Sequence, residues 1–141
     1  MTTLPNPCFD HEIRIYYEDT DAAGIVYYAN YLKFIERSRT EWLRCCGIEL
    51  SDVEAREGCQ FAVSHIDARY HKPAQLDDLL DSRVSVERVG KASLVLDQRI
   101  TKHGELLFSA RVTLACIDST RFKPRAMPAD MHSELQRWKP R

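Results

Sequence analysis

The chain has 141 residues and nearly balanced charge, with 20 lysines and arginines against 21 aspartates and glutamates. This length predicts a single domain over residues 1–141, and the charge balance argues against binding to nucleic acid or to a membrane surface. No run of about 18 apolar residues is present, which excludes a transmembrane helix, and residues 1–7 lack the pattern of a signal peptide. We therefore expect a cytoplasmic protein.

The five cysteines indicate neither a disulfide framework nor a zinc site, because their number is odd and no Cys-x-x-Cys spacing occurs. Cys45 and Cys46 fall inside a helical pattern and are expected to be buried or half-buried. Cys59 and Cys116 fall in strand patterns and are expected to lie in the core. No metal site is predicted.

The first part of the chain predicts one strand and one long helix. Residues His11–Tyr17 alternate between apolar and charged side chains, which is typical of a half-buried strand. A helix is predicted from about Tyr28 to Cys46, and Gly47 is placed to end it in a left-handed conformation. The apolar residues of this helix recur at steps of three and four, and they are Tyr31, Leu32, Ile35, Trp42, Leu43 and Cys46.

The second part predicts an antiparallel sheet. Its four long strands are Phe61–Tyr70, Leu80–Val89, Ser93–Thr101 and Leu106–Cys116, and the apolar face of the last one begins at Leu106. Tight turns at Gly90–Lys91 and His103–Gly104 indicate a meander. Short helical segments are predicted at 51–58 and within a C-terminal region of 120–141. The fold class is therefore α+β, with about five strands, one long helix and a core over about 11–119.

An acidic loop directly before the long helix is the strongest functional indication. Residues 17–31 contain three carboxylates, Glu18, Asp19 and Asp21, and a glycine turn. The start of a helix presents unpaired N–H groups and the positive end of its dipole. Carboxylates beside it supply a base or nucleophile next to donors for an oxyanion, which are the parts that acyl transfer needs. The residues alone do not choose among the three carboxylates, and an Asp here is equally typical of a helix cap.

The stretch Asp19–Tyr31 resembles the signature of the 4-hydroxybenzoyl-CoA thioesterase family, which has the hotdog fold. Further matches are Phe34–Arg39, Tyr70–Ala74 and Asp77–Asp78. The resemblance runs from about His11 to Asp118, and Tyr16–Asp21 is most similar to the Tol–Pal-associated acyl-CoA thioesterases of the YbgC type. It implies a sheet wrapped around one central helix, with pockets built between two subunits of a homodimer or homotetramer.

By this resemblance the protein is an acyl-CoA thioesterase in which Asp21 is the catalytic carboxylate, acting as general base or as nucleophile. Tyr28 aligns with the residue at the helix start whose backbone N–H polarises the thioester carbonyl. Many Tol–Pal-associated members have His at this position, whereas the hydroxybenzoyl enzymes have Tyr, so the preferred acyl group stays open. No cofactor is expected, because coenzyme A is part of the substrate, and acyl carrier protein is the alternative carrier.

Seven further residues are predicted to bind substrate, three from the loop motif, one from the second strand and three cations for the coenzyme A phosphates. In that order they are Gly24, Val26, Tyr27, His65, Lys72, Arg88 and Lys91. The strand of His65 lies near the site in the family. Exposed cations at a pocket mouth suit phosphate groups, although ordinary turn charges look the same in a sequence.

Two other functions fit the same sequence. Acyl-thioester hydratases and dehydratases share this fold, but they generally pair an Asp with a nearby His, and no His follows Asp21 before His65. A non-enzymatic acyl-thioester-binding or scaffold protein of the Tol–Pal envelope system would carry a decayed site, which the intact Asp21–Tyr31 segment disfavours. Release of free thiol from a panel of acyl-CoAs distinguishes all three functions.

Overall fold

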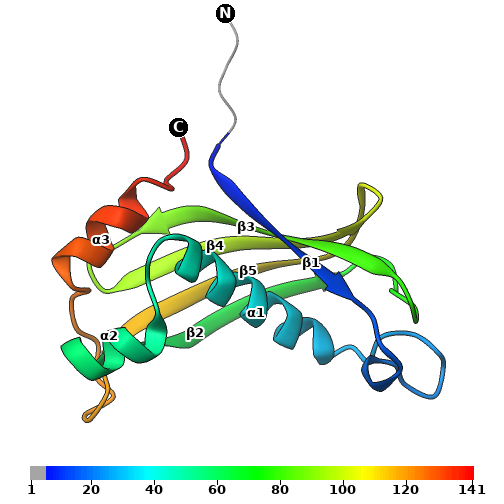
Figure 1. Cartoon of the computed structure of the whole chain (residues 1–141), viewed down its shortest axis with the longest axis horizontal. Coiled ribbons are helices and arrows are strands. Elements are labelled where there is room, and N and C mark those ends of the chain that lie inside the picture. Colours follow the sequence, from blue (N-terminus) through cyan, green and yellow to red (C-terminus); the bar gives the residue numbers. More distant parts are fainter. Residues whose placement is uncertain (1–5) are drawn as a thin grey trace, which may run out of the picture.

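The computed structural model describes residues 6–141, in which five antiparallel strands form one sheet (Figure 1). The strand order is β1-β3-β4-β5-β2, so β1 and β2 form the two edges. The strands are β1 (Cys8–Arg14), β2 (Cys59–Tyr70), β3 (Leu79–Val89), β4 (Ser93–Lys102) and β5 (Glu105–Asp118). The predicted α+β fold with about five antiparallel strands is confirmed. Residues 1–5, on which most of the signal-peptide expectation rests, lie outside the described part.

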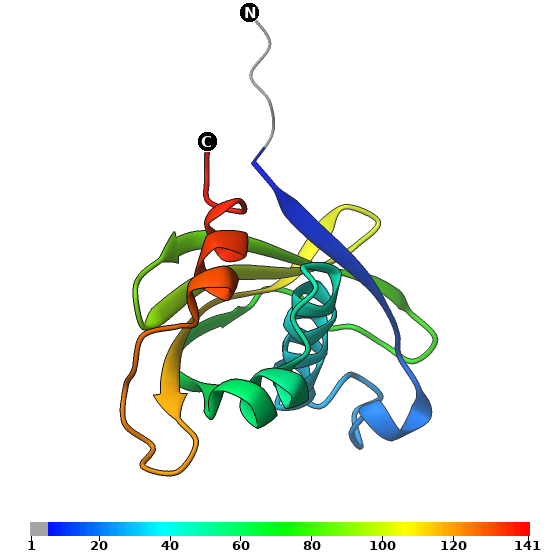
Figure 2. The same ribbon diagram turned by 60° about the vertical axis from the view of Figure 1, so that its left-hand side comes forward.

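Helix α1 (Asn30–Cys45) crosses one face of the sheet, which curves around it (Figures 1 and 2). Its buried side chains recur at steps of three and four along one side, and they are Tyr31, Phe34, Ile35, Ser38, Trp42 and Leu43. The helix begins two residues later than predicted. Leu32, predicted on the apolar face, is 39% exposed, whereas Phe34, outside the predicted set, is 1% exposed.

A buried polar network fixes α1 on the sheet. The Ser38 hydroxyl donates to the Ser82 hydroxyl of β3 at 2.6 Å, and the Gln98 side-chain amide of β4 donates to the Ile35 carbonyl at 2.7 Å. Ser38, Ser82 and Gln98 are fully buried, so these hydrogen bonds satisfy polar groups from which packing excludes water. The contacts set the position of α1 along the strands, and with it the position of the loop before α1.

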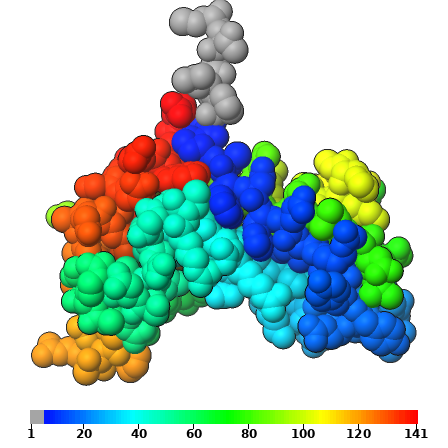
Figure 3. Space-filling view, in the orientation of Figure 1, coloured from blue at the N-terminus to red at the C-terminus, as the bar shows by residue number. Residues whose placement is uncertain are grey.

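Two short helices cover the C-terminal end of α1, while the acidic loop lies at its other end (Figures 1 and 3). Helix α2 (Leu50–Glu57) follows the turn at Gly47, and helix α3 (Ala129–Gln136) follows β5. Trp138, just after α3, packs edge-on against Trp42 of α1 with ring centroids 5.7 Å apart. One end of the α1 face is therefore closed by helices, and the other end is left to the acidic loop.

Two predicted strand details are wrong. The first strand is Cys8–Arg14 rather than His11–Tyr17, because the backbone of Ile15 bonds to the loop residues Asp77 and Asp78. Tyr17 instead begins a short 3-10 helix, η1 (Tyr17–Asp19).

The second strand error lies in β5, where Leu107 is buried with Phe108 and Leu106 is only partly buried. A β-bulge explains this, since Ile100 pairs with Phe108 but Thr101 pairs with Leu106, which leaves Leu107 as the extra residue.

The burial expected of the cysteines is confirmed except for one residue. Cys59 and Cys116 are buried in the core, and Cys46 is partly buried. Burial raises the pKa of the Cys46 thiol to about 12, with further contributions from nearby acidic groups such as Glu134. Cys45 is exposed, because its place on α1 does not face the sheet. The core thiols are therefore packing residues and lack the exposure of reactive cysteines.

Candidate active site

The loop between β1 and α1 is shaped by its own backbone hydrogen bonds. The Asp21 N–H donates to the Ile25 carbonyl at 2.9 Å, and the Gly24 N–H donates to the Asp21 carbonyl at 3.0 Å. Gly24 has a φ of 80°, which strains any residue with a Cβ, so this turn requires glycine. The Val26 N–H donates to the Ala74 carbonyl at 2.8 Å, which ties the loop to the segment that follows β2.

The three carboxylates of the loop have different surroundings. Asp19 accepts the Tyr16 N–H at Oδ2 (2.8 Å), which is a local cap of η1. Asp21 is exposed and accepts the Ala23 N–H at Oδ1 (2.8 Å), so its other oxygen is available for chemistry. Glu18 is exposed, and within residues 6–141 its carboxylate accepts no hydrogen bond. Asp19 is partly buried, so Asp21 is the one of the three carboxylates that is both exposed and held in place by a backbone N–H.

Two backbone N–H groups at the start of α1, those of Tyr28 and Ala29, have no acceptor within the described residues. The Asn30 N–H donates to the Tyr27 carbonyl at 2.9 Å. Because the peptide bond between Tyr27 and Tyr28 is trans, the Tyr28 N–H points the opposite way, out from the helix start. Free donors at the positive end of a helix dipole suit a developing oxyanion.

An apolar cavity of about 300 Å³ opens beside Tyr28, the first of these two residues. Its lining residues are Ile25, Val26, Tyr28, Tyr31, Tyr70, His71, Lys72 and Pro73. Tyr31 stacks on Phe108 with ring centroids 5.0 Å apart and meets Tyr70 edge-on at 5.5 Å. The Tyr31 hydroxyl accepts the Ala74 N–H at 3.1 Å, and burial raises the pKa of this hydroxyl. The cavity is suited to an apolar group that ends at the helix start.

Three predicted site residues line this cavity, namely Val26, Tyr28 and Lys72. Asp21 and Gly24 lie in the adjoining loop and are not among its lining residues. Five lining residues were missing from the predicted set, and they are Ile25, Tyr31, Tyr70, His71 and Pro73. The sequence held signals for all five, since Ile25 and Tyr31 belong to the loop motif and the other three belong to the Tyr70–Ala74 match.

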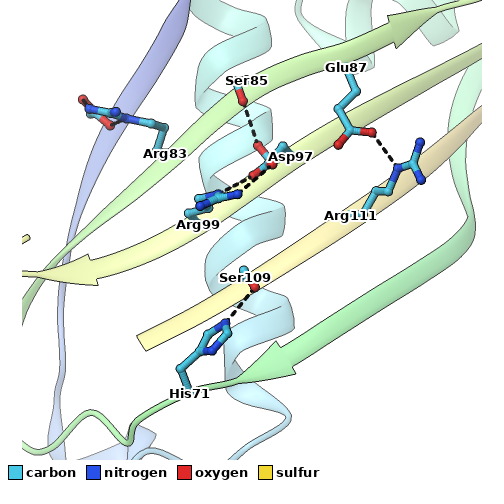
Figure 4. A network of polar contacts seen from close by, with 9 residues as sticks. His71, Arg83, Ser85, Glu87, Asp97, Arg99, Ser109 and Arg111 are labelled. Carbon is cyan, nitrogen blue, oxygen red and sulfur yellow. Dashed lines mark hydrogen bonds and ion pairs between the residues drawn. The ribbon is translucent and has the colours of Figure 1, made fainter. Parts of the chain in front are cut away.

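The rim of the cavity carries polar groups on the side of the sheet. Lys72 forms an ion pair with Glu105 at 2.7 Å, and both side chains are more than half exposed. The hydrogen bond and charge of Lys72 lower the pKa of Glu105. The His71 Nε2 atom lies 2.9 Å from the Ser109 hydroxyl, at the start of a row of polar contacts along the sheet (Figure 4). Lys72 is therefore a surface cation that an anionic group can reach.

The remaining predicted residues are not brought to this cavity within one chain. Tyr27 packs against Tyr28 with ring centroids 4.9 Å apart but is 44% exposed. His65 is exposed on β2, five residues before Tyr70, which is about 16 Å along an extended strand. Arg88 and Lys91 lie near the β3–β4 turn, at the opposite end of the sheet from the acidic loop (Figure 1).

Within residues 6–141, no group of three or more His, Cys, Asp or Glu side chains is arranged to hold a metal ion. In the same part of the chain, no helix combines the length and the apolar character that crossing a membrane requires.

Comparison with known sequences places the chain in a family. The sequence profile of the thioesterase superfamily matches residues 23–109, which include the loop turn, the helix and most of the sheet. The chain is 40% identical over 129 residues to the acyl-CoA thioester hydrolase YbgC of Escherichia coli, covering 91% of this chain and 96% of that protein. It is 31% identical over 124 residues to the acyl-CoA thioesterase YbgC of Helicobacter pylori, covering 82% and 90%.

Solved structures show the same fold. A probable thioesterase from Bartonella henselae superposes with a TM-score of 0.83 at 35% identity, over 86% of this chain and 100% of that one. A DHNA-CoA thioesterase from Staphylococcus aureus superposes with a TM-score of 0.86 at 25% identity, over 92% and 89%. The chain has the hotdog fold and belongs to the thioesterase superfamily.

Proposed function

We propose that the protein hydrolyses acyl-CoA thioesters to a free acid and coenzyme A. The observation that carries this proposal is the unpaired N–H of Tyr28 at the start of α1, because Tyr28 also lines an apolar cavity of about 300 Å³. Such a cavity suits an acyl group, and the donor suits the oxygen of its thioester. The names of the YbgC relatives in Escherichia coli and Helicobacter pylori support the same activity.

In this proposal Asp21 supplies the attacking group. As a general base, it takes a proton from water, the hydroxide adds to the thioester carbon, and the C–S bond breaks to release the coenzyme A thiolate. As a nucleophile, its carboxylate displaces the thiolate to form a mixed anhydride, which water then hydrolyses. Both routes place negative charge on the carbonyl oxygen in the transition state, where the N–H group of Tyr28 stabilises it.

The proposal includes a second copy of the chain. Asp21 lies outside the cavity of its own chain, and β2 is an open edge of the sheet. If two β2 strands pair antiparallel about a twofold axis, the end of one strand lies beside the start of the other. This arrangement brings the partner's opposite end of the sheet toward the cavity, which is the route by which His65, Arg88 and Lys91 could contact a substrate. The copy number, dimer or tetramer, stays a prediction.

Acyl carrier protein remains the alternative carrier of the acyl group. A cytoplasmic location stays a prediction, which cell fractionation would check.

Activity on a panel of acyl-CoAs would identify the preferred acyl group. Release of free thiol would support hydrolysis, whereas a hydratase would consume an enoyl group without releasing thiol. Binding of acyl-CoA without any chemical change of the acyl-CoA would support the scaffold alternative.

The Asp21→Asn variant tests the role of the carboxylate. Asparagine keeps the oxygen that accepts the Ala23 N–H but removes the base and nucleophile, so we expect turnover to fall by about a hundredfold or more. Glu18→Gln is the matched control, because it removes one negative charge from the same loop at an exposed side chain. Wild-type turnover in Asp21→Asn, or an equal loss in Glu18→Gln, would contradict the assignment.

A further inference from the structure

The last residue of β2, Tyr70, makes a hydrogen bond that reaches the start of α1. Its hydroxyl donates to the Tyr28 carbonyl at 2.8 Å, across 42 residues of sequence. The ring is held in place by edge-on contacts with Tyr31 at 5.5 Å and with Phe108 at 5.0 Å. Burial raises the pKa of the Tyr70 hydroxyl, and Tyr28 adds to the shift, so the hydroxyl keeps its proton at neutral pH and acts as a donor.

The acceptor of this hydrogen bond is a carbonyl that the helix does not use. In a regular α-helix the Tyr28 carbonyl would accept the Leu32 N–H, four residues on. Here the Leu32 N–H donates to the Ala29 carbonyl at 3.2 Å instead. Within the described residues, the Tyr70 hydroxyl is thus the donor that fixes the direction of the Tyr28 carbonyl.

The direction of this carbonyl also fixes an N–H group. The Tyr28 carbonyl and the Ala29 N–H belong to one planar trans peptide group, so they point in opposite directions. The preceding peptide group is fixed separately, by the Asn30 N–H on the Tyr27 carbonyl. Both unpaired donors at the helix start are therefore oriented by hydrogen bonds to their neighbouring carbonyls. A hydrogen bond accepted at the oxygen also polarises the N–H of the same peptide group.

We propose that Tyr70 is a positioning residue for thioester hydrolysis, which holds Tyr28 at the start of α1 through its carbonyl so that the Tyr28 N–H is presented to the thioester oxygen. This inference rests on the proposed function. It adds a residue of the sheet to a site that otherwise consists of the loop and the helix start. Because Tyr70 acts through the backbone, its loss affects the transition state more than it affects substrate binding.

The Tyr70→Phe variant tests the proposal, since it keeps the ring and removes the donor. We expect kcat to fall by about tenfold, the effect of one hydrogen bond, with KM for the acyl-CoA changed by less than about twofold. The pH profile of kcat should keep its shape, because Tyr70 does not transfer a proton. Tyr17→Phe is the matched control, since the Tyr17 side chain is 82% exposed and does not line the cavity, and it should leave kcat unchanged.

A second measurement does not depend on activity. In ¹⁵N-labelled protein, Tyr70→Phe should move the amide signal of Ala29, because its peptide oxygen loses a hydrogen bond, while Tyr17→Phe should not. Circular dichroism must show an unchanged fold in both variants.

The outcomes separate this inference from the proposed function. An unmoved Ala29 signal would overturn the contact in solution, and a moved signal with wild-type kcat would overturn the positioning role while the proposed function stands. A rise in KM with unchanged kcat would assign Tyr70 to substrate binding and also overturn positioning. A wild-type protein that releases no thiol from any acyl-CoA overturns the proposed function and this inference together.

Discussion

The ion pair between Asp78 and Lys102 stabilises a loop that contacts the candidate active site. The Lys102 ammonium lies 2.8 Å from Asp78 Oδ1, and the Gln75 N–H donates to Oδ2 at 2.8 Å. Asp78 is mostly buried, and its carbonyl accepts the Ile15 N–H at 2.9 Å. Burial alone would raise the pKa of Asp78, but the hydrogen bond and charge of Lys102 and the hydrogen bond from the Gln75 N–H lower it overall. The contact fixes the 74–78 loop, to which the acidic loop is bonded.

We expect Asp78→Asn to lower the free energy of unfolding by about 1–3 kcal/mol at pH 7, because it weakens a charge-assisted hydrogen bond in a mostly buried place. A pKa lowered by folding stabilises the protein fully above the unfolded value of about 3.9, and this contribution is lost as pH falls through the folded value. Urea unfolding at pH 7, 5 and about 3 should therefore show the difference from wild type shrink at the lowest pH. Asp77→Asn, an exposed neighbour, is the control, and an equal loss there would refute the role of the ion pair.

The choice among the loop carboxylates shows what a sequence can predict about single residues. The acidic cluster before an amphipathic helix indicated the loop, and the family resemblance indicated Asp21. The structure adds that Asp19 and Asp21 each accept one backbone N–H, but that Asp19 is partly buried whereas Asp21 is exposed. This difference depends on the path of the backbone through the turn at Gly24, which no residue pattern encodes. The catalytic role of Asp21 itself stays a prediction.

At the scale of elements, the start of α1 is the part on which the proposed chemistry depends. We expect Tyr28→Phe to keep most of the activity, because the backbone N–H is unchanged. Tyr28→Pro should lose it, since proline lacks the donor. Turnover of both variants on the best acyl-CoA measures this, after circular dichroism shows that the proline variant is folded. A folded Tyr28→Pro variant with full turnover would place the oxyanion contact elsewhere, and an inactive Tyr28→Phe variant would give the hydroxyl a direct role.

Elements could be predicted where local pattern and packing agree. The three-and-four spacing of α1 predicted its length and most of its buried face, but Leu32 is exposed and Phe34 is buried. The exact rotation of a helix on a curved sheet is set by contacts such as Gln98 with Ile35, which join residues far apart in sequence. The bulge at Leu107 could not be predicted from the sequence for the same reason, because it is defined by the pairing of β5 with β4.

At the scale of the whole molecule, the distribution of the predicted site residues is itself informative. One chain collects Val26, Tyr28 and Lys72 at the cavity but leaves Arg88 and Lys91 at the far end of the sheet. Spacing along one sequence cannot distinguish a residue that is unrelated to the site from one that reaches it across a symmetry axis. The sequence resemblance implied pockets between subunits, and the open β2 edge is the feature of the fold that such an assembly would use.

We expect a homo-oligomer joined along β2, and Val63→Lys tests it. Val63 is a large apolar residue of this edge strand and is 45% exposed, so a lysine there is tolerated by the single chain but places like charges near the twofold axis of a pair. Light scattering at micromolar concentration should give the wild type at least twice the chain mass of 16.3 kDa, and should give the variant a mass near 16.3 kDa. The variant should also lose most of its turnover, because each site needs the partner.

Leu79→Lys is the control, since Leu79 is 40% exposed on β3 and its variant should keep both mass and activity. A wild-type mass of 16.3 kDa would contradict a site shared between two copies of the chain. A Val63→Lys variant that still assembles and is fully active would show that the interface does not lie along β2.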